Sequence, residues 1–371
     1  MKVCVMKVQK VRYPRREGGD HVSWTVVGEN FLPVPEIEEY LAFLQNIEAS
    51  PNTIRAYAHH LKLFWEFLKD THQDWRTAGL ETLAQFVAWL RHPQPGTRPM
   101  QSTEAQRTEA TINAVLSAVS AFYDFHARVG RVEEIPGMKV QYGARRYKGF
   151  LHHITKTRPS QARLIKLKAP HKIPKTLTAD QVGRILDHCR HRRDRFLVAL
   201  LYETGMRIGQ ALNLRHADIE SWDNTIRIVP HADNVHGART KRREPLAVAV
   251  SSDLMALYAD YLVHEWDGID SDYVFVNLWG GARGQPLTYP AVRDLFARLS
   301  RETQIVIRPH MLRHTHATEL LRAGWDAAWV QKRLGHAQIQ TTISTYAHLN
   351  DEDLKQAFQQ YQATRKEHST P

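Results

Sequence analysis

Residues 309–346 read PHMLRHTHATELLRAGWDAAWVQKRLGHAQIQTTISTY. The leading proline suits the first turn of a helix, and Arg313 follows His310 at i+3, so both side chains share one helical face. His336 comes directly after a glycine, and Tyr346 ends a polar run. Two imidazoles, a fixed cation and a phenol are what phosphoryl transfer to a tyrosine would need. An amphipathic helix with incidental histidines is the other interpretation that this stretch alone leaves open.

The composition limits the class of protein. The 371 residues suit two domains, and a hydrophobic content of 43% supports ordinary packed cores. A net charge of +11 and a pI near 9.6 indicate a polyanionic partner, nucleic acid before membrane. No apolar run approaches the ~20 residues of a membrane span, and no signal peptide is recognisable at the start. The 2 cysteines exclude a disulfide framework. We therefore expect a cytoplasmic protein, nucleoid-associated when bound to double-stranded DNA.

The N-terminal part of the chain is predicted to be helical. Residues 1–33 are a basic N-terminal extension, whose alternating stretch 22–26 indicates a strand pair, an arm that touches DNA, or a solvated segment. Residues 34–135 carry four apolar stripes at helical spacing and no strand pattern, which predicts a small all-α bundle with aromatic side chains in its core. Arg55 and Lys62 lie off the apolar face of the second helix and are candidate DNA contacts.

A basic linker is predicted at residues 136–175. It contains no Asp or Glu from residue 139 onward, while Lys and Arg are frequent and Gly and Pro interrupt any helical pattern. We interpret it as a segment that lies along DNA phosphates, with Arg145, Arg146 and Lys148 as candidate contacts. A merely solvated linker is the alternative.

Residues 176–371 are predicted to form an α+β domain, so the whole chain is expected to be mainly α (α+β). A capping box at Thr178 opens this domain, and helical stripes recur along it. Helices are expected from 179 to 189 and from 208 to 214, and over 196–203, 253–265, 289–302, 311–323 and 327–334, with short strands at 225–229, 246–250 and 273–276.

Two further cations are candidates for chemistry. Gly205 provides a turn that delivers Arg207 to a helix N-terminus, where free N–H groups and the guanidinium favour an anion. A surface arginine is the commoner reading of such a position. Lys241 lies between two predicted strands together with Arg239 and Arg242, either at a hairpin tip that enters a DNA groove or in an ordinary basic turn.

Neither a metal nor a cofactor is expected. His310 and His314 are spaced at i and i+4, but a zincin helix needs Glu after its first histidine and Met311 stands there. Cysteines and paired carboxylates are absent nearby, and the sequence holds no Gly-rich phosphate loop of the nucleotide-hydrolysing kind.

The ordered set Arg207, Lys241, His310-x-x-Arg313, Leu334-Gly335-His336 and Tyr346 resembles the tyrosine recombinase (phage integrase) family. The resemblance is strong over residues 177–350 and looser over 35–130. It implies a helical core-binding domain (a SAM-like bundle) followed by a mixed α/β DNA breaking-rejoining catalytic domain with a small antiparallel sheet. The lysine region is longer than the usual short Gly-Lys turn and is similar to that of mobile-element integrases. Close competitors for the role of Lys241 are Arg239, Arg242 and Arg243.

The resemblance also implies a mechanism without metal or ATP. Tyr346 would attack a scissile phosphate to form a 3′-phosphotyrosyl link, with His310 as its general base. The two arginines Arg207 and Arg313 would hold the non-bridging oxygens. His336 would donate a hydrogen bond to the phosphate, and Lys241 would protonate the departing 5′-oxygen.

Further implications concern assembly and alternative tasks. Members of the family act as tetramers on DNA, and the apolar stripe Leu354, Phe358 and Tyr361 would dock on a neighbouring protomer or pack in its own chain. Two other functions fit the same fold, namely a topoisomerase IB-like nicking-closing enzyme and a catalytically silent DNA-binding regulator. The target sequence, and the choice between integration, excision, transposition and dimer resolution, are not encoded in these motifs.

Overall fold

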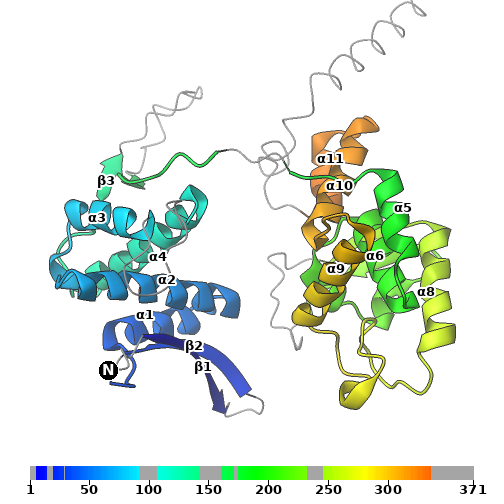
Figure 1. Ribbon diagram of the computed structural model, residues 1–371, viewed down its shortest axis with the longest axis horizontal. Helices are drawn as coiled ribbons and strands as arrows, with labels where there is room; N and C mark the ends of the chain where they lie inside the picture. The colour runs from blue at the N-terminus through cyan, green and yellow to red at the C-terminus, as the bar shows by residue number, and fades with distance from the viewer. Residues whose placement is uncertain are drawn as a thin grey trace, which may run out of the picture. The chain divides into compact units, whose positions relative to one another are not determined.

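The computed structural model describes residues 6–14, 20–28, 30–91, 107–141, 160–170, 174–231 and 245–335. The chain divides into two compact units, Met1–His171 and Lys172–Pro371 (Figure 1). Each unit has its own hydrophobic core and is considered by itself. Among the described residues, no helix has the length and apolar character needed to cross a membrane.

The described part of the first unit is built on four helices. Their apolar stripes meet in one core, in which Ile37, Leu61, Phe64 and Phe122 have exposed fractions of 0%. Aromatic rings pack edge-on inside it, as in the pair Phe64–Phe86 with ring centroids 5.1 Å apart. The prediction that these aromatics form a core is confirmed. The elements are α1 (Pro35–Asn46), α2 (Pro51–Asp70), the 3₁₀ turn η1 (Trp75–Thr77), α3 (Leu80–Arg91) and α4 (Glu109–Arg128).

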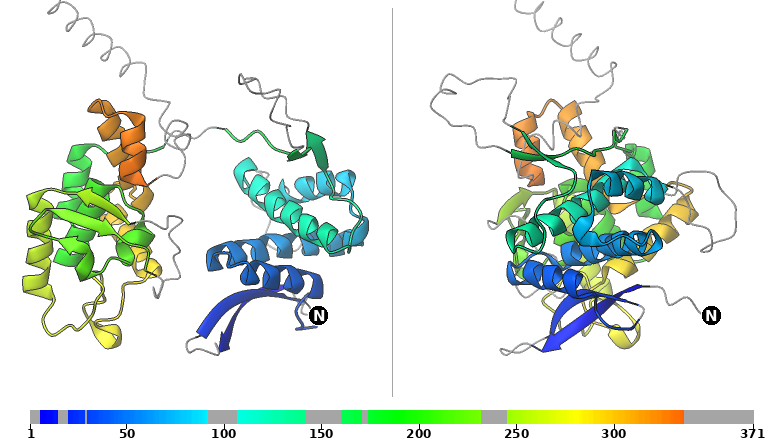
Figure 2. Two further views of the ribbon diagram at one scale, coloured as in Figure 1. Left: turned by 180° about the vertical axis from the view of Figure 1, so that it is seen from behind. Right: turned by 90° about the vertical axis from the view of Figure 1, so that its left-hand side faces the viewer.

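A β-hairpin precedes these helices and packs against α1 and α2 (Figure 2). Its strands β1 (Lys7–Pro14) and β2 (Asp20–Val27) pair antiparallel. Val26 is 1% exposed within the helical core, and the Thr25 hydroxyl donates to the Glu38 carboxylate of α1 at 2.5 Å. The guanidinium of Arg55 on α2 lies 4.9 Å from the ring centre of Trp24. The strand pair forms and is part of the first unit's core, and contact of this segment with DNA stays a prediction.

A second strand pair lies within the predicted linker. Strands β3 (Met138–Gln141) and β4 (Ser160–Arg163) pair antiparallel. The Asn113 side chain of α4 donates to the Leu167 carbonyl at 2.8 Å and accepts from the Leu167 N–H at 3.0 Å. The residues after β4 are therefore fastened to the helical unit, which the sequence did not indicate. Arg145, Arg146 and Lys148 lie outside the described residues.

Helices dominate the second unit as well, around a three-stranded antiparallel sheet. The mainly α (α+β) prediction is thus confirmed. The helical elements are α5 (Ala179–Asp187), α6 (Arg192–Thr204), α7 (Ile208–Leu212), η2 (His216–Asp218), α8 (Ser252–Glu265), η3 (Gly280–Ala282), α9 (Tyr289–Thr303), α10 (Pro309–Arg322) and α11 (Ala327–Leu334). The sheet consists of β5 (Ile219–Glu220), β6 (Thr225–Ile228) and β7 (Leu246–Ala249).

The strand expected at 273–276 does not form. All four residues are buried, but their backbone makes only isolated bridges, Arg215 with Tyr273 and Val276 with Pro286. Neither bridge extends into a ladder, because the partner chains leave the extended conformation: η2 begins at His216 and α9 begins at Tyr289. This apolar run reflects burial in the core and not membership of a sheet.

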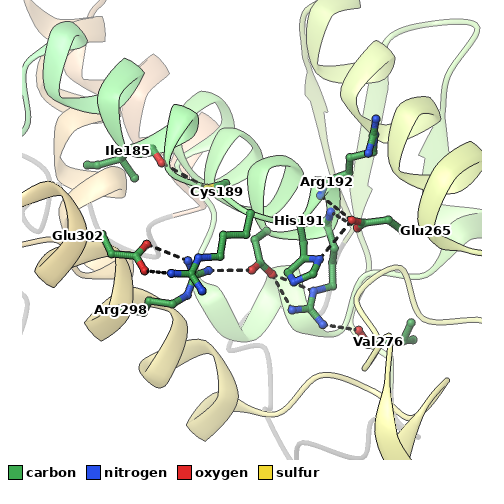
Figure 3. Close-up of polar contacts among 11 residues, drawn as sticks. Ile185, Cys189, His191, Arg192, Glu265, Val276, Arg298 and Glu302 are labelled. Atoms are coloured by element: carbon green, nitrogen blue, oxygen red, sulfur yellow. Dashed lines mark hydrogen bonds and ion pairs between the residues drawn. The ribbon is translucent and has the colours of Figure 1, made fainter.

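A buried charged network ties the start of α6 to α9 (Figure 3). Arg193 and Asp194 are 5% and 2% exposed, and Nη2 of Arg193 donates to Oδ1 of Asp194 at 2.6 Å. Arg298 of α9 donates to the other carboxylate oxygen at 3.3 Å and to Glu302 at 3.0 Å. Nη1 of Arg193 also donates to the carbonyl of Val276 at 2.9 Å. Each buried charge thereby has a partner, as burial requires.

Candidate active site

The turn after α6 places Arg207. Gly205 ends the helix in the left-handed region with φ 60°, and Arg207 becomes the N-cap of α7. The Arg207 N–H donates to Oε1 of Gln210 at 2.8 Å, which fixes the backbone of this turn. The Arg207 side chain remains exposed. Partial desolvation lowers its pKa, but a guanidinium stays charged at any physiological pH.

Gly205 also permits a close approach of two other helices. A Cβ atom at this position would lie 2.7 Å from Cδ2 of Leu334 on α11 and 2.8 Å from Cδ2 of His316 on α10. Glycine is therefore needed here for two independent reasons, its positive φ and the absence of a side chain.

Arg313 joins the same three helices from the inside. Its side chain is 4% exposed. Nη1 donates to the carbonyl of Gly205 at 2.6 Å, and Nη2 donates to the carbonyl of Leu334 at 2.9 Å. Both acceptors are carbonyls at helix ends, where the backbone lacks helical partners. The guanidinium thus holds the turn that carries Arg207 against the end of α11.

His310 lies on the first turn of α10 beside both arginines. Burial lowers its pKa, and the positive charges of Arg313 and then Arg207 lower it further. The ring centre of His314 is 6.2 Å from that of His310. Three of the predicted site residues, namely Arg207, His310 and Arg313, are therefore close enough to interact. A neutral imidazole near two guanidiniums can accept a proton while the cations bind an anion.

The other predicted residues have different outcomes. Arg55 stacks on Trp24, and Lys62 pairs with Glu66 at 3.0 Å. Neither contact tests whether these side chains bind DNA, and both stay predicted DNA contacts. Outside the described residues lie Lys241, His336 and Tyr346, together with Arg239 and Arg242. Within the described ranges, no group of three His, Cys, Asp or Glu could hold a metal ion.

Two residues of this region were not indicated by the sequence. His316 is 7% exposed and accepts a hydrogen bond at 3.0 Å from Arg333. The only sequence signals were weak: His316 follows Arg313 at i+3, and Arg333 precedes the Leu334-Gly335-His336 motif. Their partners are brought together by the tertiary fold, which residue spacing does not reveal.

Family models match most of the chain. A model described as the phage integrase family matches residues 175–353, and a model of the phage integrase N-terminal SAM-like domain matches residues 37–130.

Related proteins match over nearly the whole length. Transposase A from transposon Tn554 of Staphylococcus aureus is 42% identical over 365 residues, covering 98% of this chain and 99% of the relative. The tyrosine recombinase XerC of Oceanobacillus iheyensis is 27% identical over 337 residues, covering 88% and 94% of the two chains.

Solved structures show the same fold at low sequence identity. The integrase of transposon Tn1549 in complex with a circular intermediate DNA has a TM-score of 0.59 at 14% identity, covering 88% of this chain and 99% of that one. The XerH recombinase bound to palindromic difH DNA has a TM-score of 0.59 at 21% identity, covering 90% and 86%.

Proposed function

Because the chain belongs to the phage integrase family of tyrosine recombinases, which are DNA strand transferases, we propose that it is the site-specific recombinase of a mobile element. The observation that carries the proposal is that Arg207 and Arg313 both lie near enough to the neutral His310 to lower its pKa, while Arg313 is held by two backbone carbonyls. The 42% identity to a transposase over 98% of the chain favours a mobile element. We propose that it acts in the cytoplasm, with the nucleoid, because its substrate would be DNA.

The proposed reaction begins at Tyr346. Its phenolic oxygen attacks the scissile phosphorus, a 3′-phosphotyrosyl bond forms, and the bond to the 5′-oxygen breaks. A phenol titrates near pH ~10, so a neutral His310 is suited to accept its proton. Lys241 gives a proton to the departing 5′-oxygen. The phosphotyrosyl bond conserves the energy of the broken bond, so rejoining needs no ATP.

The arginines supply the positive charge of the reaction. Arg207 and Arg313 bind the non-bridging oxygens and stabilise the charge that builds up in the transition state. His336 adds a hydrogen bond to the same phosphate. Arg313 is held in advance by two carbonyls, at 2.6 and 2.9 Å, which supports a preorganised site.

The test uses DNA that the protein itself selects. A binding site is enriched from a randomised duplex pool, its cleaved phosphate is mapped, and a nicked duplex is built to trap the covalent adduct on denaturing gels. We expect Tyr346→Phe to bind this duplex and form no adduct. Tyr289→Phe is the matched control, because Tyr289 is 56% exposed at the start of α9 and has no role in the proposed chemistry.

Each other outcome points to a different function. An adduct that persists in Tyr346→Phe would refute the assigned nucleophile. Relaxation of a supercoiled plasmid that lacks the selected site would identify a nicking-closing enzyme. Specific binding by the wild-type chain without any adduct would identify a silent regulator.

We further propose that four copies assemble on the DNA. A cavity of about 300 Å³ is lined by Leu246 and Ala247 of β7, by Trp325 before α11, and by Trp329, Lys332 and Arg333 of α11. Trp329 is 67% exposed beside it. An apolar side chain from another copy would fit such a surface, and the stripe Leu354, Phe358 and Tyr361 of a neighbour's tail is the proposed occupant.

A further inference from the structure

The guanidinium of Arg333 contacts three segments of the second unit. Arg333 lies in the last turn of α11 and is half-buried. Its Nε donates to Nε2 of His316 at 3.0 Å, and its Nη2 donates to the carbonyls of Glu203 and Ala249, both at 3.1 Å. These acceptors lie on α10, near the end of α6 and at the end of β7. One side chain therefore joins three elements that are distant in the sequence.

His316 is suited to be the acceptor of this hydrogen bond. Burial and the charges of Arg333 and Arg313 lower the pKa of its imidazole to about 3, so the ring is neutral at physiological pH. Because Nε2 accepts from Arg333, Nδ1 carries the proton and is available to the backbone of Tyr202, with which the ring is hydrogen-bonded. Arg333 thus gains a fixed acceptor without a second cation beside it.

The Glu203 side chain strengthens the same junction. Its Oε2 accepts from the Ser251 hydroxyl at 2.8 Å, and its Oε1 accepts from the Ser251 backbone N–H. Ser251 is the N-cap of α8 and lies just after the end of β7. Arg333 and Glu203 together therefore clamp the end of β7 to the end of α6.

We propose that Arg333 is a positioning residue for DNA strand cleavage. It holds in one geometry the chain segments that lead to the arginine that binds the phosphate, the lysine that donates the proton and the histidine that donates a hydrogen bond. This inference rests on the proposed function. In the sequence, Arg207 lies shortly after Glu203, Lys241 precedes β7, and His336 follows α11. Without the clamp, β7 is held less firmly, and the proton donor upstream of it is misplaced at the 5′-oxygen. A misplacement of ~1 Å costs about 100-fold in rate.

The experiment compares two Arg→Met substitutions in the second unit. Arg333→Met keeps the aliphatic stem and removes every donor, whereas Arg293→Met removes the same charge from α9, where the side chain is 70% exposed. On the selected duplex we expect Arg333→Met to form the adduct about 100-fold more slowly in a single turnover. Its Kd should equal that of Arg293→Met, which should cleave at the wild-type rate. A 5′-bridging sulfur, which leaves without a proton, should restore most of the lost rate.

The outcomes separate this inference from the proposed function. Equal cleavage rates of Arg333→Met and wild type would overturn it. An equal loss of cleavage rate on the unmodified duplex and on the duplex with the 5′-bridging sulfur, together with a loss of folded protein, would also overturn it. Failure of the wild type to form any adduct would refute the proposed function instead. Hydrogen exchange then tests the clamp alone, because the Ser251 amide should exchange faster in Arg333→Met than in Arg293→Met, and unchanged exchange would contradict the clamp.

Discussion

Replacing Gly205 by alanine should destabilise the second unit by about 2–5 kcal/mol. A side chain in the left-handed region, here at φ 60°, costs about 1–2 kcal/mol. The new Cβ would lie 2.7 Å from Leu334 and 2.8 Å from His316, closer than such contacts normally come. Overpacking of this kind costs about 1–3 kcal/mol. For a unit of this size the sum lowers the Tm by roughly 10 °C.

Two other glycines separate the contributions. Gly324 has φ +84° and no atom within 4 Å of its would-be Cβ, so Gly324→Ala should show the backbone strain alone, about 1–2 kcal/mol. Gly183 lies inside α5, also with nothing within 4 Å, and Gly183→Ala should be neutral or stabilising by up to about 1 kcal/mol. Urea denaturation of the three variants measures these free energies.

The same substitution should also slow cleavage, since the Gly205 carbonyl accepts from Arg313 and Arg207 follows in the same turn. Adduct formation per folded molecule should therefore fall in Gly205→Ala and be retained in Gly324→Ala. Equal destabilisation of these two variants would refute the reasoning, because it would mean that the space at Gly205 can accept a methyl group.

Three further outcomes are expected. In the free protein His310 should titrate below ~6.5, and Arg207→Gln should raise its pKa in an NMR titration, because one of the neighbouring charges is removed. Since the folded-state pKa of His310 is lowered, the residue contributes stability above pH ~6.5 that is lost as the pH falls through the folded-state pKa. An unchanged pKa of His310 in Arg207→Gln would show that the charge of Arg207 does not act on this histidine. Asp194→Asn should cost about 3–5 kcal/mol by thermal denaturation, because Arg193 and Arg298 lose their buried carboxylate, and a stable variant would contradict the network's importance. Trp329→Ala should prevent assembly into tetramers on the selected duplex in sedimentation experiments while leaving the protein folded, and tetramers that persist would move the proposed docking surface elsewhere.

The helices of both units follow from local patterns. Stripes such as Ile54, Leu61 and Phe64 repeat at the helical period and are buried as that period requires. The apolar run at 273–276 misled because a short buried segment looks the same whether or not it belongs to a sheet. The pair β3–β4 gave no signal, since its strands are short, and the Asn113 carbonyl that Arg163 of β4 contacts is far away in the sequence.

The candidate site was predictable to a different degree. Arg207, His310 and Arg313 were expected together from the ordered motifs, and they do lie close together. That Arg313 would bind two backbone carbonyls was not expected. Arg333 could not be found by spacing, because its carbonyl acceptors are 130 and 84 residues away. Contacts over such separations depend on how helices pack, and a linear pattern does not carry that information.

The N-terminal hairpin has a practical consequence for anyone who expresses fragments of this chain. The SAM-like domain model matches only from residue 37, so a fragment cut at that boundary would lack β1 and β2. Val26 would leave an apolar gap beside α1 and α2, and Glu38 would lose the Thr25 hydroxyl. Such a fragment would expose core side chains to water and tend to aggregate. A soluble version of the first unit should begin before Met6.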